Sequence, residues 1–239
     1  SGIVSACELK GFKVIVYDIN GEALIKAKNS IVSGYEKLVE KGKLDINSVK
    51  SAENNIFCVT DFAELAPCDI VIEAAVENID MKKQLFSRLE EITKENTIFA
   101  TNTSSFSVTS ISTAVKNNRG RVVGMHFFNP ANIMKLVEVI KGEFTSEEVL
   151  RSASDFAKKL GKVPVICNDT PAFIVNRVAR AFYGESLKIM GEENMEASQI
   201  DVIMREEGGF AMGPFQLMDL IGIDVNLSVT KSVYEAFFY

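Results

Sequence analysis

Short apolar runs alternate with longer segments of helical periodicity through the first two thirds of the chain. Strand-like runs cover residues 12–17, 56–59, 69–75, 97–101, 121–127 and 163–167, and helical patterns cover 21–41, 81–93 and 146–160. The run at 69–75 is almost entirely apolar, as is typical of a strand buried on both faces of a parallel sheet. Strands separated by helices predict β-α-β crossovers. We therefore expect an α/β fold with a doubly wound parallel sheet.

The pattern changes at the segment Asn168-Asp169-Thr170-Pro171. Beyond it the sequence predicts helices only, at about 172–190, 196–205, 214–220 and 224–237. Thr170 or Asp169 is suited to cap a helix whose first position is Pro171, where a missing N–H costs nothing. The sequence therefore predicts a first domain over 1–169 and an all-α second domain over 170–239.

Composition narrows the class of protein. The chain has 239 residues, 47% of them hydrophobic and 24% charged, with a net charge of −6. This composition is ordinary for a globular protein, and the acidic balance argues against a nucleic-acid surface. The longest apolar runs fall far short of the ~20 residues of a membrane span. Four widely spaced cysteines without a C-x-x-C pair indicate reduced thiols in a cytoplasmic protein, and a lone histidine argues against a metal site.

His126 is the only histidine in the chain, and Glu138 follows on a new apolar stretch at 136–140. Histidine has the unperturbed pKa nearest neutrality, and a carboxylate on its second ring nitrogen fixes the tautomer and raises the basicity. The two residues are therefore a candidate general-base pair. The alternative at this stage is a histidine that only satisfies its hydrogen bonds inside the core.

Asp18 follows the strand-like run at 12–17 and precedes a helical segment. In a Rossmann-like dinucleotide-binding fold, an acidic residue at this position binds the adenosine ribose hydroxyls and favours NAD over NADP. Aspartate also begins turns and caps helices, so the observation alone leaves both readings open. The Gly-rich phosphate loop that should precede it is not found, because residues 1–3 open a helical segment. We expect the first strand and its loop to be missing, and both ends to be truncated.

Several ordered motifs give the chain a resemblance to the L-3-hydroxyacyl-CoA dehydrogenases, especially their short-chain bacterial members. The resemblance extends over essentially the whole chain, and the motifs are Ala74–Asn78, Ala100–Ser105, Gly124–Pro130, Met134–Ile140, Asp169–Arg177 and Met212–Phe215. An ordered set of this kind is far more specific than a single Gly-rich loop.

The resemblance implies roles for individual residues in the oxidation of an L-3-hydroxyacyl-CoA by NAD. It makes His126 the base and Glu138 its orienting partner. It makes Ser104, with Ser105 as the fallback, and Asn176 the residues around the reacting part of the substrate. Positions matching the family's cofactor contacts are Asp18, Glu77, Lys82, Asn102 and Asn129.

For the coenzyme A portion the resemblance selects Lys41, although Gly34 stands where the family has a serine. It also implies a homodimer through the helical domain, with Phe237, Phe238 and Tyr239 as candidate contacts. Two other functions remain open at this stage. One is a binding or structural remnant without catalysis, suggested by the missing loop. The other is a related dehydrogenase of a sugar acid or carnitine, against which the pair Phe127-Phe128 argues.

Overall fold

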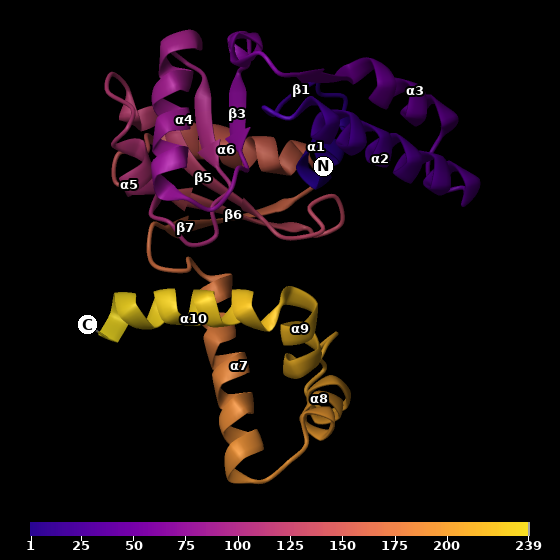
Figure 1. Cartoon of the computed structure of the whole chain (residues 1–239), viewed down its shortest axis with the longest axis vertical. Coiled ribbons are helices and arrows are strands. Elements are labelled where there is room, and N and C mark those ends of the chain that lie inside the picture. The colour runs from indigo at the N-terminus through magenta and orange to yellow at the C-terminus, as the bar shows by residue number, and fades with distance from the viewer. Residues whose placement is uncertain (239) are drawn as a thin grey trace. The chain divides into compact units, whose positions relative to one another are not determined.

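Two β-sheets form the centre of the first unit in the computed structural model, which describes residues 1–238 (Figure 1). Strands β1 (Val14–Tyr17) and β2 (Ile56–Val59) pair in parallel in the smaller sheet. The larger sheet has the order β3 (Ile70–Glu73), β4 (Ile98–Thr101), β5 (Val122–Phe127), β6 (Leu136–Lys141) and β7 (Val163–Asn168). The predicted Rossmann-like sheet is confirmed, with β1, β3, β4 and β5 each shorter at one or both ends than expected.

One pair of strands departs from the predicted parallel sheet. Strands β3, β4 and β5 run parallel, as do β6 and β7, but β5 and β6 are antiparallel. Only residues 128–135 connect β5 to β6. Parallel neighbours need a crossover of a dozen or more residues, so this short connection returns the chain in the opposite direction.

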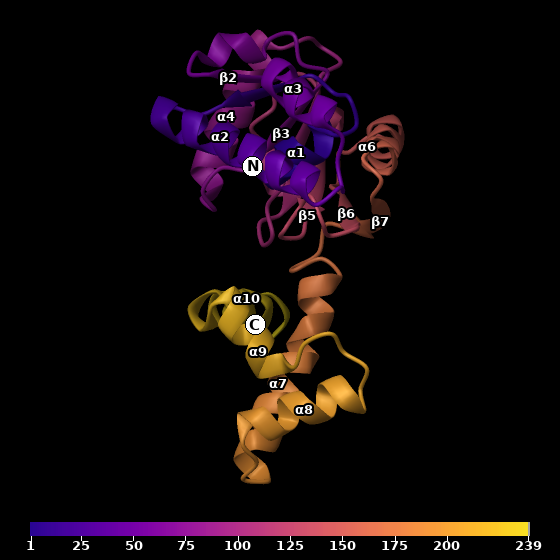
Figure 2. The ribbon, with the colours of Figure 1, turned by 90° about the vertical axis from the view of Figure 1, so that its right-hand side faces the viewer.

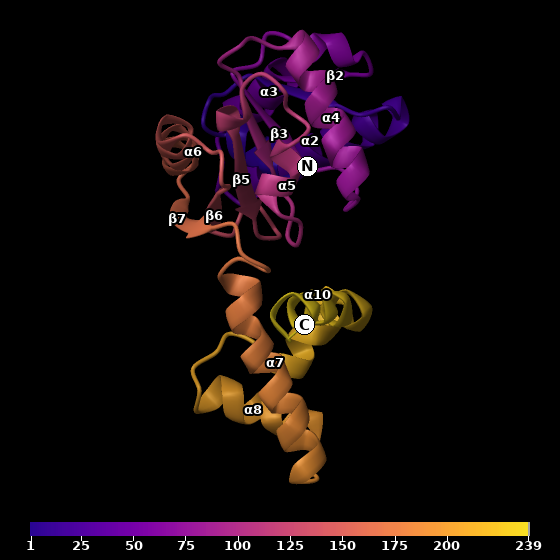
Figure 3. The same ribbon diagram turned by 90° about the vertical axis from the view of Figure 1, so that its left-hand side faces the viewer.

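Helices cover both faces of the larger sheet. Helices α4 (Ile79–Ile92) and α5 (Val108–Ser112) lie on one side and α6 (Glu147–Lys159) on the other (Figures 2 and 3). The central strands are consequently buried, and β5 is buried along its whole length. Val123, Met125 and Val139 are fully inaccessible and pack in one cluster with Leu150 and Ala153 of α6.

Three further helices accompany the smaller sheet. They are α1 (Gly2–Glu8), α2 (Gly21–Glu40) and α3 (Ile46–Asn55). The sequence did not predict α3, which has few apolar positions, but Val49 and Ala52 pack with Ile31 and Tyr35 of α2 in a second core cluster. Short 3₁₀ turns occur at Phe62–Leu65 and Arg119–Arg121.

A cleft of about 1330 Å³ lies in the first unit and is lined by residues from both β1 and β3. Each of these strands has only one hydrogen-bonded neighbour within residues 1–238, namely β2 and β4 respectively. As a result Ile70, Val71 and Ile72 are only partly buried, although their apolar run predicted burial on both faces. The expectation was wrong for these residues because the cleft takes the place of packing beside β3.

The second unit consists of helices and also includes the segment 104–107. Its helices are α7 (Val175–Glu192), α8 (Ala197–Glu206), α9 (Pro214–Ile221) and α10 (Ile223–Phe238), and α10 crosses α7 in Figure 1. Asp201 of α8 accepts hydrogen bonds from Phe215 N and Gln216 N at the start of α9. A Cβ atom on Gly213 would lie 2.2 Å from Asp201 Oδ1, so glycine is required at this contact.

The start of α7 differs from the prediction. The helix begins at Val175, because Ala172 and Phe173 adopt left-handed backbone angles, with φ of 60° and 51°, that a right-handed helix cannot contain. Asp169 caps a different helix: its carboxylate accepts from Val108 N at 3.0 Å and Thr109 N at 2.7 Å at the start of α5. The predicted cap at Asp169 or Thr170 with Pro171 in the first turn was therefore wrong.

No helix among residues 1–238 combines the length and the apolar character needed to cross a membrane. The predicted contact residue Tyr239 lies outside the described residues.

Candidate active site

His126 and Glu138 face each other across two antiparallel strands. His126 of β5 is in direct register with Glu138 of β6, which places both side chains on the same face of the sheet. Their side chains meet, with His126 Nδ1 2.7 Å from Glu138 Oε2. Both residues are buried, at 6% and 1% exposure. The register of two strands therefore builds the pair that the sequence placed twelve positions apart.

The contact fixes the chemistry of the imidazole. An ionised carboxylate only accepts hydrogen bonds, so Nδ1 donates its proton to Glu138 and Nε2 is the basic nitrogen. Glu138 stabilises the imidazolium that forms when Nε2 takes up a proton. The ring of His126 is also held from the side by Phe128, whose ring centre lies 4.6 Å away. The arrangement can accept a proton from a hydroxyl group and return it.

Gly124 of β5 allows β6 and α5 to pack closely against β5 near this pair. A Cβ atom on Gly124 would lie 2.7 Å from the Ile140 side chain and 2.9 Å from that of Val108. Two residues away, the same strand carries His126. Glycine in the motif Gly124–Pro130 therefore has a packing role, because a larger residue would displace β5 from β6 or from α5.

Three of the predicted cofactor residues line the cleft of the first unit, namely Asp18, Asn102 and Asn129. Asp18 is exposed beyond the carboxyl end of β1, and its Oδ1 accepts from Asn20 N at 2.9 Å. Asn102 follows β4, and its Oδ1 accepts from Phe127 N at 2.8 Å, which leaves its NH₂ group to donate to a ligand. Open α/β sheets bind nucleotides at the carboxyl ends of their strands. The three residues therefore lie at the edge of the first unit where a fold of this kind binds a nucleotide.

The other two predicted cofactor residues, Glu77 and Lys82, belong to a network of charges. Lys82 Nζ lies 2.8 Å from Glu73 Oε1 and 3.1 Å from Glu77 Oε2. The Lys82 side chain is 1% exposed, whereas that of Glu77 is 38% exposed. Lys82 is therefore placed behind Glu77, where it holds that carboxylate. Glu77 is the exposed member of the network.

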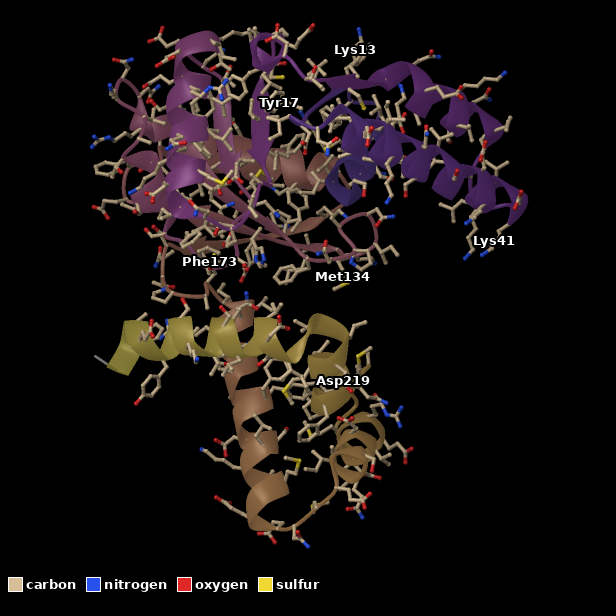
Figure 4. All side chains as sticks on the ribbon, in the orientation of Figure 1. Lys13, Tyr17, Lys41, Met134, Phe173 and Asp219 are labelled. Atoms are coloured by element: carbon tan, nitrogen blue, oxygen red, sulfur yellow. The ribbon has the colours of Figure 1, made fainter. Side chains whose placement is uncertain are left out.

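The predicted substrate residues lie in different parts of the chain. Ser104 and Ser105 are partly buried in the segment 104–107, and Asn176 is partly buried in the first turn of α7. Lys41 caps the end of α2 and is exposed, as Figure 4 shows. Lys28, near the other end of α2, has a structural role, since its Nζ donates to the carbonyls of Glu53 and Ile56.

Sequence reasoning missed two buried charged residues near the candidate site. Glu73 ends β3, and the only signal for it was a charge at the end of an apolar run. Lys162 donates from Nζ to the carbonyls of Ala131 and Met134, at 2.6 and 2.8 Å, and so fixes the turn that follows Asn129. No sequence pattern predicted this contact, because its acceptors are backbone carbonyl oxygens about thirty residues away in the sequence.

Comparison with known families gives two matches in chain order. Residues 1–170 match the 3-hydroxyacyl-CoA dehydrogenase NAD binding domain, and residues 173–239 match the C-terminal domain of the same family. The NAD cofactor expected from Asp18 and the motifs is confirmed by the first match.

Among individual proteins, 3-hydroxyadipyl-CoA dehydrogenase of Escherichia coli K12 is 44% identical over 99% of this chain, which spans 50% of that relative. A probable 3-hydroxybutyryl-CoA dehydrogenase of Deinococcus radiodurans is 39% identical, with 98% of this chain and 84% of the relative covered. The solved structure of (S)-3-hydroxybutyryl-CoA dehydrogenase from Ralstonia eutropha superposes with a TM-score of 0.95 at 36% identity, covering 99% of this chain and 83% of that one. The chain belongs to the 3-hydroxyacyl-CoA dehydrogenase family.

Proposed function

We propose that this protein oxidises the 3-hydroxyl group of an L-3-hydroxyacyl-CoA, with 3-hydroxybutyryl-CoA as the preferred substrate class, or carries out the reverse reduction. The observation that carries the proposal is the buried contact of His126 Nδ1 with Glu138 Oε2. A secondary alcohol does not ionise near neutral pH, so its oxidation requires a base in contact with the hydroxyl. Relatives named for 3-hydroxybutyryl-CoA and 3-hydroxyadipyl-CoA support the substrate class.

In the proposed reaction His126 Nε2 removes the proton of the 3-hydroxyl group, and Glu138 stabilises the resulting imidazolium. In the reverse direction the same nitrogen returns the proton to the 3-oxo oxygen. Bound NAD supplies the acceptor for the hydride that leaves C3. A positioned base of this kind contributes typically about 10²- to 10⁴-fold to the rate.

The cofactor is held by residues of the first unit. Asp18 binds the adenosine ribose hydroxyls, and its charge repels the 2′-phosphate of NADP. Asn102 and Asn129, which also line the cleft, bind toward the nicotinamide end together with Glu77. Lys82 positions Glu77 through the ion pair between Lys82 Nζ and Glu77 Oε2.

The direct test exchanges the base. His126→Gln should retain NAD binding and lose turnover by about two or more orders of magnitude, because the amide cannot take up the proton. Steady-state kinetics and isothermal titration with NAD measure the two quantities. Wild-type turnover in this variant would contradict the role of His126. Loss of NAD binding would show that the change disturbs the cofactor site instead of proton transfer.

Ser104 is proposed to hold the 3-oxygen of the substrate, where a hydroxyl donor stabilises developing charge. The neighbouring Ser105 offers a matched control. Ser104→Ala should lower kcat about 100- to 1000-fold, with a smaller loss in Ser105→Ala. The reverse order would transfer the role to Ser105. Asn176 is proposed to approach the same part of the substrate, and Asn176→Ala should raise KM for acyl-CoA without changing the affinity for NAD.

Kinetics with a series of acyl-CoA substrates define the specificity. We expect kcat/KM to be highest for short unbranched chains and higher with NAD than with NADP. Lys41 is proposed to contact the coenzyme A phosphates, so Lys41→Met should raise KM for every acyl length about equally. Lys43→Met, the same exchange at a second exposed lysine, is the control. A preference for 3-hydroxyadipyl-CoA would redirect the proposal to dicarboxylic substrates.

We also propose that the helical unit forms a homodimer. Its helices expose large apolar side chains, among them Leu220 at 71%, Ile223 at 64% and Leu227 at 52%. Leu227→Asp should yield a monomer in light scattering, whereas Ile25→Asp, at a comparably exposed site on α2, should not. Equal mass for both variants and the wild type would contradict this interface.

We further propose a cytoplasmic location, which the four free cysteines support.

A further inference from the structure

The connection between β5 and β6, residues 128–135, forms part of the wall of the cleft. Asn129 and Ala131 of this connection are lining residues. Asn129 is exposed, and its side-chain amide makes no hydrogen bond to another of residues 1–238. The position of this amide at the cleft therefore depends on the backbone that carries it.

Lys162 ties this connection to the rest of the first unit. Its Nζ donates to Ala131 O at 2.6 Å and to Met134 O at 2.8 Å. Apart from backbone bonds inside the turn itself, these are the two hydrogen bonds that the stretch 129–134 makes within the described part of the chain. The place of this stretch consequently depends on one lysine side chain.

Burial makes the contact with Lys162 a strong one. Lys162 is 8% exposed and Ala131 is 5% exposed. An ammonium group is costly to bury unless its donors are bonded, and hydrogen bonds from a charged donor are stronger than those between neutral groups. A movement of the stretch 129–134 would leave a buried cation without these acceptors. Lysine and backbone therefore hold each other in place.

We propose that Lys162 is a positioning residue for cofactor binding, which fixes the stretch 129–134 so that Asn129 is in place before NAD binds. A site that is already ordered avoids the entropic cost of ordering a segment on binding. Lys162 itself does not line the cleft, so its effect passes through the backbone of the stretch. The inference rests on the proposed function in that the cleft binds NAD with a contact from Asn129.

A double-mutant cycle on the intact protein tests whether the two residues act together, with the dissociation constant of NAD⁺ measured by calorimetry. Asn129→Ala should weaken binding about 2- to 10-fold, the usual effect of one lost hydrogen bond. Lys162→Met should weaken it by a similar or smaller factor. The double variant should bind NAD⁺ within about twofold of Asn129→Ala, because the contribution of Asn129 is lost only once.

Lys28 offers a matched control for the loss of a lysine that binds backbone carbonyls. Its Nζ also donates to two carbonyl oxygens, those of Glu53 and Ile56, at 2.8 Å each. Lys28→Met removes the same kind of contact without touching the stretch 129–134, so the affinity for NAD⁺ should change less than about twofold. Equal weakening by both lysine variants would assign Lys162 a general structural role and overturn the proposal.

Amide hydrogen exchange gives a readout that needs no cofactor. The amides of Ile133 and Met134, which donate to Pro130 O, should exchange faster in Lys162→Met than in wild type. In Lys28→Met their exchange should be unchanged. Lys162→Gln, with a shorter and neutral side chain, carries the same expectations and replaces Lys162→Met if that variant does not fold. Wild-type exchange of both amides in the Lys162 variant would overturn the proposal.

The binding data separate this inference from the proposed function on which it rests. Losses that multiply in the double variant would show that Lys162 acts independently of Asn129 and would overturn the inference alone. Wild-type affinity in either single variant would do the same. A wild-type protein that does not bind NAD⁺ would instead refute the proposed NAD site, and the inference with it.

Discussion

Two buried charge clusters of the first unit differ in their ratio of acids to bases. His126 pairs through Nδ1 with one carboxylate, that of Glu138. Lys82 has two carboxylates, Glu73 and Glu77, one on each side. A base that must gain and lose a proton needs one stabilising partner and one basic nitrogen. A cation that is enclosed by two acids is fixed in position.

The largest expected effect is on the His126 cluster. Glu138→Gln removes the charge that stabilises the imidazolium and orients the ring, so kcat should fall about 10²- to 10⁴-fold with little change in NAD affinity. Stopped-flow measurement of NADH formation tests this. Glu143→Gln, the same exchange at an exposed position after β6, should retain wild-type kcat. Wild-type kcat in Glu138→Gln would show that the His126 cluster does not depend on its carboxylate for catalysis.

A substitution in the Lys82 cluster should lower the stability of the fold. Lys82→Met leaves Glu73 buried without its cation, and breaking a buried pair in this way costs about 3 kcal/mol of unfolding free energy. Urea unfolding followed by circular dichroism measures the loss. The double variant with Glu73→Gln should recover most of it, because no buried charge is then left unpaired. Equal midpoints for Lys82→Met and wild type would show that the cluster is not charge-coupled.

A smaller effect is expected from the packing that supports the His126 cluster. Gly124→Ala places a methyl group 2.7 Å from Ile140 and should destabilise the fold by about 1 to 3 kcal/mol while lowering kcat. Gly34→Ala is the control, since no atom lies within 4 Å of its added methyl group and the site is inside a helix. It should raise stability by up to about 1 kcal/mol. Equal stability of the two variants would contradict the close approach of β5 to β6.

The smallest effect appears only in alkali. Burial, together with the smaller effect of the negative charges of Glu138 and Asp169, raises the pKa of the Cys167 thiol from an ordinary 9.0 to about 12. The folded protein therefore keeps a proton that the unfolded chain loses, so this contribution to stability is complete below pH 9 and declines as the pH rises toward 12. The slope is at most about 1.4 kcal/mol per pH unit for one thiol.

Urea unfolding of Cys167→Ala between pH 8 and 11 tests this slope, which should be shallower than in wild type. Cys58→Ala, at a partly exposed thiol, serves as the control. An identical slope in wild type and Cys167→Ala would show that the thiol does not contribute. A lower pKa of Cys167 in Glu138→Gln would confirm that Glu138 is charged in the folded protein.

Sequence periodicity determined the local elements, because strand and helix place apolar side chains at different intervals. It located nearly every strand of the first unit and each helix of the second to within a few residues, and the motifs named His126 and Glu138. It failed at α3, whose few apolar residues are buried only through contact with α2, and at the start of α7. Asp169 looked like the cap of the following helix, but folding brings it to the start of α5.

The order of residues along the chain therefore shows which side chains can do the chemistry and in which kind of element each one lies. Their pairing depends on how these elements come together in the fold. The antiparallel register of β5 and β6 sets His126 opposite Glu138, and the meeting of β3, β4 and α4 encloses Lys82 between Glu73 and Glu77. Periodicity is a property of neighbouring residues, whereas these contacts join positions from different elements, so their partners are fixed by strand register and packing.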